Sequence, residues 1–404
     1  MQNLKPVLNI GVVGHVDHGK STLVKALTGV WTAKHSEEIK RGMTIKLGFA
    51  NAAFYKCPVC GKYSSSDRCP YCGNVTQFVR AVSFVDSPGH EVLMARMLSG
   101  AAIMDGAILV IAANEPCPQP QTREHFAALE IIGVRNLVIV QNKVDVVDPE
   151  AAKKNYKEIK QMVSGTWAER APIIPVSALR GANLPELIRA LIEYIPVPAR
   201  DPSAPLKMYV IRSFDTNRPG TLPQEFRGGV IGGSVVSGLI KVGDEIQILP
   251  GAKLDGSIEP LIAQVTGLKS GDIELISADP GGLIGVQTDL DPSLTKADNL
   301  VGNVVGKVGM IPNPTYEIDA EIHVFQRVIG TKEMRVLEPI KPGEQVVVAV
   351  GPAIVTAVVK QIKKDRAEIR FSRPVVAEIG ARIALARRVQ DKWRLTGYGT
   401  IKSL

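Results

Sequence analysis

The first half of the chain alternates short apolar runs with stretches of helical period. The runs lie at residues 10–13, 82–85, 106–112, 137–141 and 173–176. Apolar residues at helical spacing separate them, as in LVKALTG and NLPELIRALIEYI, and a basic amphipathic helix is predicted over residues 149–168. Strands that alternate with helices predict a doubly wound α/β domain, with its ligand loops at the carboxyl ends of the strands.

The hydrophobic period changes beyond a proline-rich linker at residues 195–207. Short stretches punctuated by glycine, such as GGVIGGSVVSG and EQVVVAVG, then follow one another without a helical stripe of useful length. Many short strands at regular spacing are typical of β-barrels, and a Pro-Asn-Pro triplet before residue 315 divides them into two. The predicted domains are an α/β domain at 1–200, with an insertion at 56–74, and two barrels at 206–314 and 315–404.

Composition is that of an ordinary soluble globular protein. The 404 residues, 45% hydrophobic and 22% charged, suffice for two or three domains with their own cores. No apolar run has the length of a membrane span and the start lacks the layout of a secretory signal, so we expect a cytoplasmic protein with no membrane partner. The net charge of +8 favours a polyanionic partner, and twelve Lys and Arg against four Asp and Glu from Lys360 onward favour nucleic acid.

One segment of the first half matches a phosphate-binding loop. Residues 9–22 read NIGVVGHVDHGKST, an apolar run followed by the spacing G-x-x-x-x-G-K-[ST] and a helical stretch. In such a loop backbone N–H groups and the helix dipole hold phosphate oxygens, the lysine lies along the β- and γ-phosphates, and the next hydroxyl ligates Mg²⁺. The predicted contacts are His18, Gly19, Lys20, Ser21 and Thr22 for the nucleotide, with Ser21 also on Mg²⁺.

Three further motifs follow apolar runs in the order that a guanine-nucleotide switch requires. Asp86 begins DSPG at a predicted strand end, where its carboxylate would face the metal. The motif NKVD contains Asp145, which can accept hydrogen bonds from the N1–H and the exocyclic amine of guanine, a pair that adenine does not offer. The tripeptide SAL supplies a backbone contact to the guanine O6. The predicted guanine site comprises Asn142, Lys143, Asp145, Ser177, Ala178 and Leu179, and the first domain is predicted to be a phosphate-loop GTPase.

Two residues are candidates for sensing the γ-phosphate. The polar segment 31–46 lacks a clean period and ends in RGMTI, so we expect it to order with GTP through Thr44 as a ligand of Mg²⁺. The alternative for Thr44 is a β-branched residue that opens a strand. His90 directly follows Asp-Ser-Pro-Gly, from where it could orient the attacking water as the catalytic residue, although a lone histidine is usually structural.

Four of the five cysteines form a cluster in the insertion. The sequence there reads CPVCG, eight residues, then CPYCG, and two C-x-x-C turns at this separation suit one tetrahedral Zn²⁺. Four thiolates leave no open position, so the predicted site is structural. Iron as in a rubredoxin-like site, and disulfides as in a hyperthermophile's cytosol, are the alternatives. The predicted ligands are Cys57, Cys60, Cys69 and Cys72, whereas Cys117 is interpreted as a small buried side chain.

These motifs together resemble the translational GTPases. GHVDHGKST, DSPGH and NKVD are similar to the motifs of elongation factor Tu, which has one α/β domain and two β-barrels. Three features are similar to the gamma subunit of archaeal and eukaryotic translation initiation factor 2: the four-cysteine insertion, the loop ANEPCPQPQTREHFAALEIIG and the barrel strand FRGGVIGGSVVSG. This resemblance covers essentially the whole chain.

The resemblance implies a function and a set of partners. Proteins of that family carry methionyl initiator tRNA to the small ribosomal subunit in their GTP state, as part of a heterotrimer with alpha and beta subunits, and release the tRNA after hydrolysis to GDP. It also implies that Asp17 contacts the nucleotide and lies near Mg²⁺, although an aspartate in such a loop can simply cap it. Met43 stands in the first switch where the elongation factors have isoleucine, a change of similar volume.

Two other functions use the same three-domain plan. The GTPase subunit of bacterial sulfate adenylyltransferase is not expected to carry the four-cysteine insertion. The selenocysteine-specific elongation factor adds a further C-terminal domain, whereas this chain ends at Leu404 soon after the second predicted barrel. A nucleic-acid finger in the insertion is disfavoured, because the insertion has few basic residues.

Overall fold

The computed structural model describes residues 5–32, 47–88, 94–218, 220–222, 225–329, 336–390 and 392–404. The chain divides into two compact units. The first is formed mainly by Met1–Pro198, and the second by Ala199–Gln326 and Leu337–Leu404. Within the described ranges, no helix combines the length and the apolar character needed to cross a membrane.

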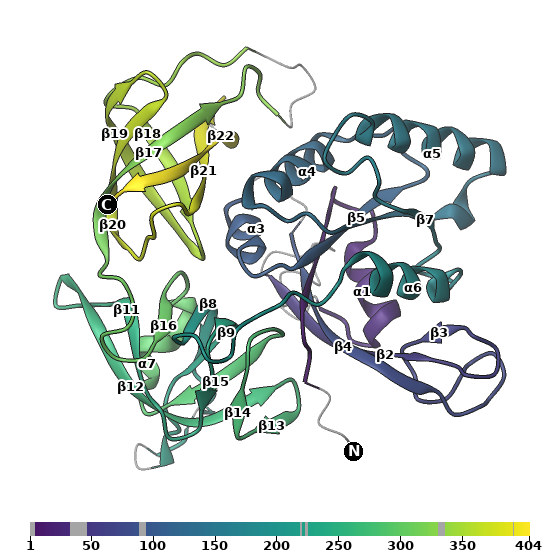
Figure 1. The fold of residues 1–404 in the computed structure, drawn as a ribbon, viewed down its shortest axis with the longest axis horizontal. Helices are drawn as coiled ribbons and strands as arrows, with labels where there is room; N and C mark the ends of the chain where they lie inside the picture. The colour runs from purple at the N-terminus through teal and green to yellow at the C-terminus, as the bar shows by residue number, and fades with distance from the viewer. Residues whose placement is uncertain are drawn as a thin grey trace. The chain divides into compact units, whose positions relative to one another are not determined.

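The first unit is built on a seven-stranded sheet in the order β3-β2-β4-β1-β5-β6-β7 (Figure 1). From β4 to β7 along this order neighbouring strands run parallel, while β2 is antiparallel to β4 and to β3. Every residue of β1, β5 and β6 is buried, which explains their continuous apolar runs. The strands are β1 (Asn9–Gly14), β2 (Gly48–Lys56), β3 (Tyr63–Ser64), β4 (Gln77–Asp86), β5 (Gly106–Ala112), β6 (Leu137–Asn142) and β7 (Ile173–Pro175).

The helices of this unit begin and end where local sequence signals place them. Asp148 caps α5 by accepting the N–H of Ala151 at 2.8 Å, and Gly133 ends α4 with a φ of 92°. The helix predicted over 149–168 ends earlier, at Val163, because Ser164 is extended and Gly165 has a φ of 70°. The helices are α1 (Lys20–Thr28), α3 (Met94–Ala101), α4 (Pro120–Ile132), α5 (Pro149–Val163) and α6 (Leu184–Tyr194), with a 3₁₀ turn η2 (Val144–Val146).

Helices cover both faces of the sheet, as the α/β prediction requires (Figure 1). On one face Leu27 of α1 and Leu191 of α6 join a buried cluster with Ile10 of β1 and Ile108 of β5. Helix α4 packs against β1 and β5 and contacts α3. The doubly wound fold is confirmed, and it brings the carboxyl ends of β1, β4 and β6 to one edge of the sheet.

The second unit begins with a ring of six antiparallel strands. The order β11-β16-β8-β9-β15-β12 is closed by pairing between β12 and β11, and β13 extends the sheet from β12. The ring consists of β8 (Lys207–Phe214), β9 (Val230–Ser237), β11 (Glu245–Leu254), β12 (Ser257–Ser270), β15 (Ile284–Thr288) and β16 (Val304–Gly306). The smaller elements are β10 (Ile240–Lys241), β13 (Ile273–Leu275), β14 (Ser277–Ala278), α7 (Pro292–Thr295) and the 3₁₀ turn η4 (Lys296–Asp298).

A second ring follows in the order β17-β20-β19-β18-β21-β22 and closes through β22 and β17. Buried residues alternate with exposed ones along most of β19, as the period of two predicts. The prediction of two β-barrels after the α/β domain is confirmed. The strands are β17 (Thr315–Val324), β18 (Gln345–Val350), β19 (Ala353–Lys363), β20 (Arg366–Val375), β21 (Arg382–Val389) and β22 (Lys392–Ser403).

Contacts between the two rings explain why they form one unit. Val376, which follows β20, packs in one small apolar cluster with Leu249 and Val304 of the first ring. Lys207 at the start of β8 pairs with Glu378 through an Nζ–Oε1 distance of 2.6 Å. The rings therefore share both an apolar contact and an ion pair.

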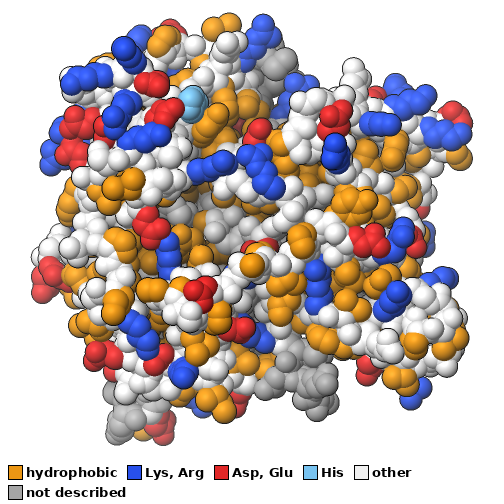
Figure 2. Space-filling model, in the orientation of Figure 1, with side chains coloured by type: hydrophobic (Ala, Val, Ile, Leu, Met, Phe, Trp, Pro, Cys, Tyr) orange, Lys and Arg blue, Asp and Glu red, His pale blue; other side chains and the backbone are white. Residues whose placement is uncertain are grey.

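The basic excess near the end of the chain is partly neutralised. Lys360, Arg366, Arg387 and Lys402 each form an ion pair with a carboxylate in the second ring. Figure 2 shows Lys and Arg side chains interspersed with Asp and Glu on the face in view. The positive charge of this region is therefore weaker evidence for a nucleic-acid partner than the count of residues indicates.

Candidate nucleotide-binding site and metal centre

The phosphate loop connects β1 to α1 and packs directly on the neighbouring strands. Gly14 and Gly19 have φ values of 143° and 87°. A Cβ on Gly14 would lie 2.3 Å from the carbonyl oxygen of Val110 in β5, and one on Gly19 would lie 2.4 Å from Nδ2 of Asn142. Because no larger residue fits at either position, the two glycines set the path of the loop.

Two buried histidines, His18 within the loop and His125 in α4, connect this loop to the protein by hydrogen bonds. Nδ1 of His125 in α4 accepts the N–H of Gly14 at 2.9 Å, and Nδ1–H of His18 donates to the Val110 carbonyl at 2.9 Å. Nε2 of His18 also lies 3.4 Å from Glu115 Oε2. Burial lowers the pKa of both imidazoles to about 3, so they are neutral at neutral pH and each can keep one nitrogen as an acceptor.

Lys20 is buried at the start of α1, and its Nζ donates to the carbonyl oxygen of His15 at 2.5 Å. Burial lowers the pKa of Lys20 to about 8, while Asp86 and Asp17 act in the opposite direction. Asp17 is exposed and has a φ of 61°, a conformation that aspartate tolerates in turns. The lysine is therefore held where the motif predicts phosphate.

Two hydroxyl groups meet at the carboxylate that ends β4. Ser21 Oγ and Thr32 Oγ1 both donate to Oδ2 of Asp86, each at 2.6 Å. Hydroxyl and carboxylate oxygens are ligands that Mg²⁺ prefers, so the predicted pair of Ser21 and Asp86 fits this ion. Two of the predicted residues, Thr44 and His90, lie outside the described residues.

Asn142 connects the phosphate loop to the predicted guanine site. Its Nδ2 donates to the His18 carbonyl at 2.9 Å, and its Oδ1 accepts the N–H of Ala178 at 3.0 Å. One side chain at the end of β6 therefore joins two segments that are far apart in sequence. Since the amide of Ala178 is engaged in this bond, its predicted contact with guanine O6 would have to share that amide.

The other members of the predicted guanine site lie in short turns at the same sheet edge. Lys143 has a φ of 62° and leads into η2, which holds Asp145 with its carboxylate 4.0 Å from Nε of Arg180. The tripeptide SAL starts a turn in which Ser177 and Ala182 exchange backbone hydrogen bonds, and Leu179 is 77% exposed. The site therefore combines a buried Asn142 with an accessible carboxylate.

Sequence reasoning missed His125, Glu115 and Thr32. His125 and Glu115 both lie in the loop that carried the family resemblance, where each is one polar residue among several. Thr32 follows the first helix without a motif around it. Each of these residues contacts a partner that is far away in sequence and is brought close only by the order of the strands in the sheet. Spacing along the chain therefore does not predict these contacts.

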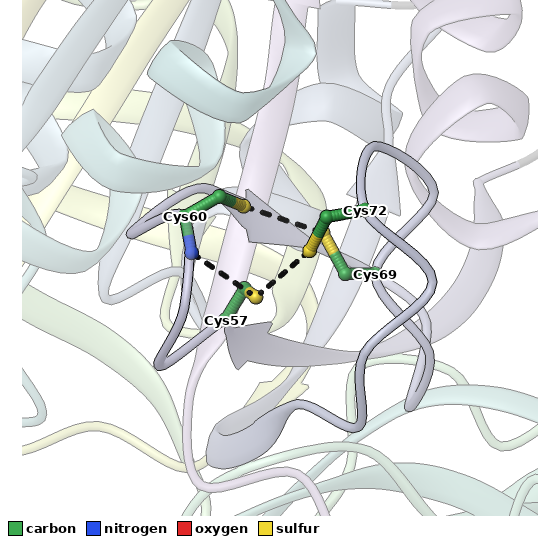
Figure 3. A group of neighbouring side chains, drawn as sticks. All are labelled: Cys57, Cys60, Cys69 and Cys72. Carbon is green, nitrogen blue, oxygen red and sulfur yellow. Dashed lines mark hydrogen bonds between the residues drawn. The ribbon is translucent and has the colours of Figure 1, made fainter.

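The four clustered cysteines converge in the insertion between β2 and β4. Figure 3 shows their side chains turned toward one another from two facing loops. All four sulfur atoms lie within 4.8 Å of one another, and the Cys57–Cys72 and Cys60–Cys69 sulfur pairs are 3.5 Å apart. Four sulfurs about 2.3 Å from a central ion in a tetrahedron would be ~3.8 Å apart, so the cluster fits a metal of zinc's size.

The two loops of this cluster have the same construction. The N–H of Gly61 donates to the Cys57 carbonyl at 3.0 Å, and the N–H of Gly73 donates to the Cys69 carbonyl at 2.9 Å. Both glycines have positive φ, 71° and 74°, as the two CPxCG sequences predict. Each loop therefore presents one buried and one exposed cysteine to the centre.

Hydrogen bonds shift the thiol pKa values of the cluster in opposite directions, and contacts with the other three cysteines help to raise the pKa of Cys60 to about 11. The side chain of Asn74, 3.4 Å from Sγ of Cys72, lowers the pKa of that thiol to about 6. All four cysteines are free, which disfavours the disulfide alternative.

Cys117 lies apart from this group. It is half-buried, where the sequence analysis interpreted it as a small buried side chain, with Sγ 3.9 Å from Sδ of Met162. Burial raises the pKa of its thiol to about 12, which makes it unreactive.

A mainly parallel sheet that carries a phosphate loop, a strand-end aspartate and an Asn-Lys-x-Asp motif, followed by two β-barrels, defines a GTPase of the translational class. The family model described as the elongation factor Tu GTP binding domain matches residues 5–197. The model described as the C-terminal part of initiation factor eIF2 gamma matches residues 316–401. The two models thus cover the α/β domain and the second barrel.

Curated relatives agree over the full length. Proteins named translation initiation factor 2 subunit gamma are 55% identical in Pyrococcus horikoshii and 54% in Methanocaldococcus jannaschii, each over 98% of this chain and 97% of the relative. The Aeropyrum pernix protein of the same name is 54% identical over 98% of both chains. The chain belongs to the family of gamma subunits of translation initiation factor 2.

Solved structures agree on the fold. A bacterial selenocysteine-specific elongation factor, EF-Sec, has a TM-score of 0.75 and 23% identity over 98% of this chain and 58% of its own. Elongation factor SelB from Methanococcus maripaludis, in complex with the GTP analogue GppNHp, has a TM-score of 0.72 and 23% identity over 100% of this chain and 80% of its own. Because identity to the gamma subunits is more than twice as high, the alternative functions are not favoured.

Proposed function

We propose that the first unit binds GTP and GDP with Mg²⁺ and hydrolyses GTP to GDP. The phosphates would lie against the backbone N–H groups of residues 15–20 and the buried Lys20, at the N-terminus of α1. Asp145 would read the guanine N1–H and amine. The residues assigned to the nucleotide are Asp17, His18, Gly19, Lys20, Ser21, Thr22, Asn142, Lys143, Asp145, Ser177, Ala178 and Leu179.

Four residues would hold the magnesium ion. Ser21 and Asp86, whose oxygens lie 2.6 Å apart, and the exposed Asp17 form the described part of the proposed site, and Thr44 would complete it. A bound Mg²⁺ would neutralise charge on the β- and γ-phosphates. A lone pair of the Ser21 hydroxyl would face the ion while its proton still points to Asp86, and Thr32 Oγ1 donates a second hydrogen bond to the same carboxylate oxygen.

His90 would orient the water that attacks the γ-phosphate. Unassisted hydrolysis by such a switch is slow, on the order of 10⁻⁴ to 10⁻² per second, so an activating protein or the ribosome would stimulate it. We further propose structural Zn²⁺ at Cys57, Cys60, Cys69 and Cys72. The four-thiolate donor set and the equivalence of the two loops support a closed site, and metal analysis would separate zinc from iron.

Family membership supports a specific cargo. We propose that the chain, with alpha and beta subunits in a cytoplasmic heterotrimer, binds methionyl initiator tRNA in the GTP state and delivers it to the small ribosomal subunit. The observation that carries this proposal is the identity of 54–55% over 98% of the chain, which spans both the GTPase unit and the two barrels. Release would follow when loss of the γ-phosphate frees Thr44 and the first switch relaxes.

An Asp145→Asn variant tests whether this chain's own nucleotide controls the tRNA. Asparagine offers an amide N–H to the second carbonyl of xanthine and loses the carboxylate that pairs with guanine. We expect GTP affinity to fall by about 10²- to 10³-fold, the equivalent of losing a charged hydrogen-bond pair, and xanthosine triphosphate to replace GTP. With alpha and beta subunits present, fluorescent methionyl initiator tRNA should then be retained with xanthosine triphosphate alone. Retention that still depends on GTP would contradict the proposal.

A further inference from the structure

Thr32 lies where the chain leaves the first helix and approaches the end of β4. Helix α1 ends at Thr28, Gly29 closes it with a φ of 75°, and Thr32 is the last described residue before the segment that contains Thr44. Thr32 is 7% exposed, and its Oγ1 donates to Oδ2 of Asp86 at 2.6 Å. Thr32, which lies at the start of the predicted GTP-responsive segment 31–46, is therefore bonded to Asp86, the first residue of the DSPG motif.

The sheet leaves room for this side chain. Gly48, the first residue of β2, is the register partner of Asp86. A Cβ on Gly48 would lie 2.7 Å from Cβ of Thr32 and 3.4 Å from Cβ of Asp86. Because contacts under 3.0 Å force a shift, a larger residue at position 48 would displace Thr32. The absence of a side chain at Gly48 thus leaves the space that the Thr32 side chain occupies beside Asp86.

We propose that Thr32 is a positioning residue for the carboxylate that binds Mg²⁺. Oδ2 of Asp86 receives two hydroxyl groups in this structure, one from Thr32 and one from Ser21. If Ser21 moves toward a bound ion, the bond from Thr32 would still hold Asp86 in its orientation. Outer hydrogen bonds of this kind orient metal-binding carboxylates, and their loss weakens metal binding about 10- to 100-fold. The inference rests on the proposed binding of Mg²⁺ and guanine nucleotide.

The experiment compares Thr32→Val, which keeps the branched shape and loses the hydroxyl, with Thr32→Ser, which keeps the hydroxyl. The release of a fluorescent GDP analogue is timed over a series of Mg²⁺ concentrations and in EDTA. We expect Thr32→Val to raise the Mg²⁺ concentration that half-slows release by about tenfold, with release in EDTA changed less than about twofold. Thr32→Ser should restore the wild-type requirement for Mg²⁺.

Thr28→Val is the matched control. Thr28 is the last residue of α1, and its hydroxyl bonds backbone groups, donating to the Val24 carbonyl at 2.8 Å and accepting the N–H of Val30 at 3.0 Å. This variant should keep the wild-type Mg²⁺ requirement. Gly48→Ala crowds Thr32 without removing its hydroxyl and should raise the requirement, so it provides a second test if Thr32→Val does not fold.

Two results would overturn the inference. One is an unchanged Mg²⁺ requirement in folded Thr32→Val or Gly48→Ala protein. The other is release that is faster by the same factor with Mg²⁺ and in EDTA, because that is what a purely structural role predicts. If the wild-type protein itself shows no Mg²⁺-dependent retention of guanine nucleotide, the proposed function fails and the role of Thr32 with it.

Discussion

The phosphate loop and the cysteine cluster both lie in the first unit, yet different partners hold them. The phosphate loop is bonded to the protein around it, with His125 on Gly14, Val110 on His18 and Asn142 on the His18 carbonyl. The sulfur atoms of the cysteine cluster, by contrast, contact mainly one another and nearby polar groups, and two of the four cysteines are exposed.

The difference in contacts matches two kinds of ligand, one that exchanges and one that supports the fold. A loop held by its own protein keeps its shape while a nucleotide binds, leaves and is replaced, which a switch requires. A group of four thiolates would repel one another without a cation, so the proposed metal would be part of the fold of the insertion. The comparison predicts that the two sites respond independently and to different changes.

The largest expected effect is the loss of zinc from a Cys69→Ser variant. Structural zinc sites contribute about 10 kcal/mol or more of binding free energy in zinc-finger peptides, so residues 57–76 should lose their fixed structure. Metal analysis should show that zinc falls from one ion per chain to none, and hydrogen exchange should become fast in this segment. Cys117→Ser is the matched control and should keep its zinc, because Cys117 lies outside the cluster.

The same variant tests the independence of the two sites. Nucleotide affinity should change by less than about twofold, since distant sites without shared partners behave additively. Loss of nucleotide binding together with zinc would show that the insertion supports the phosphate loop, and the comparison would be wrong.

A smaller effect is expected when Asn142 is replaced by alanine. Asn142→Ala removes the bonds to the His18 carbonyl and from the Ala178 amide, two buried interactions worth about 1–3 kcal/mol. GDP affinity, measured by fluorescence titration, should therefore fall about 10- to 100-fold, while zinc content stays at one ion. Asn136→Ala is the control. Asn136 directly precedes β6, at the opposite end of the strand from Asn142, and its side chain donates a hydrogen bond to the Asp105 carbonyl. Equal losses in the two variants would mean that Asn142 has no special place in the site.

The smallest expected effect is a loss of folding stability at acidic pH. The pKa of His125 is lowered by burial from 6.5 to about 3, so the unfolded chain binds more protons than the folded chain between these values. Above pH 6.5 the imidazole is neutral in both the folded and the unfolded chain, so it does not change the free energy of unfolding. Below pH 6.5 the free energy of unfolding falls by up to ~1.4 kcal/mol per pH unit for this histidine. His18 adds a similar contribution.

His125→Asn separates that contribution, because asparagine Oδ1 can accept the Gly14 N–H and does not titrate. The loss of stability between pH 6.5 and about 5 should be shallower in the variant, by up to ~1.4 kcal/mol per unit. Urea unfolding in a Trp393→Phe background, where Trp31 and Trp167 report on the first unit, measures it. An equal slope in variant and parent would show that His125 is protonated without cost.

The sequence was most informative where the chemistry is local. The phosphate loop, the two CPxCG turns and the strand-end positions of Asp86 and Asn142 follow from fixed spacings and from apolar runs that must be strands. The contacts of Thr32 and His125 join residues 54 and 111 positions apart, and only the order β4-β1-β5 brings them together.

Element ends were predicted less well than element types. The basic helix stops at Val163 because the backbone at Ser164 and Gly165 turns away, although the sequence beyond it stays polar and compatible with a helix. β7 includes only Ile173–Pro175 of its apolar run, because the following SAL tripeptide turns toward Asn142. In both places a tertiary contact or a glycine overrides the hydrophobic period.

The most direct test of the account is protection of the ester bond of methionyl initiator tRNA from hydrolysis. The chain, with its alpha and beta subunits, would be mixed with methionyl initiator tRNA or with valyl elongator tRNA, in GTP or in GDP, at one stated salt concentration. We predict slower hydrolysis of the initiator ester alone, and a stronger effect with GTP than with GDP. Equal hydrolysis in GTP and GDP, or equal protection of the valyl ester, would contradict a nucleotide switch that holds initiator tRNA.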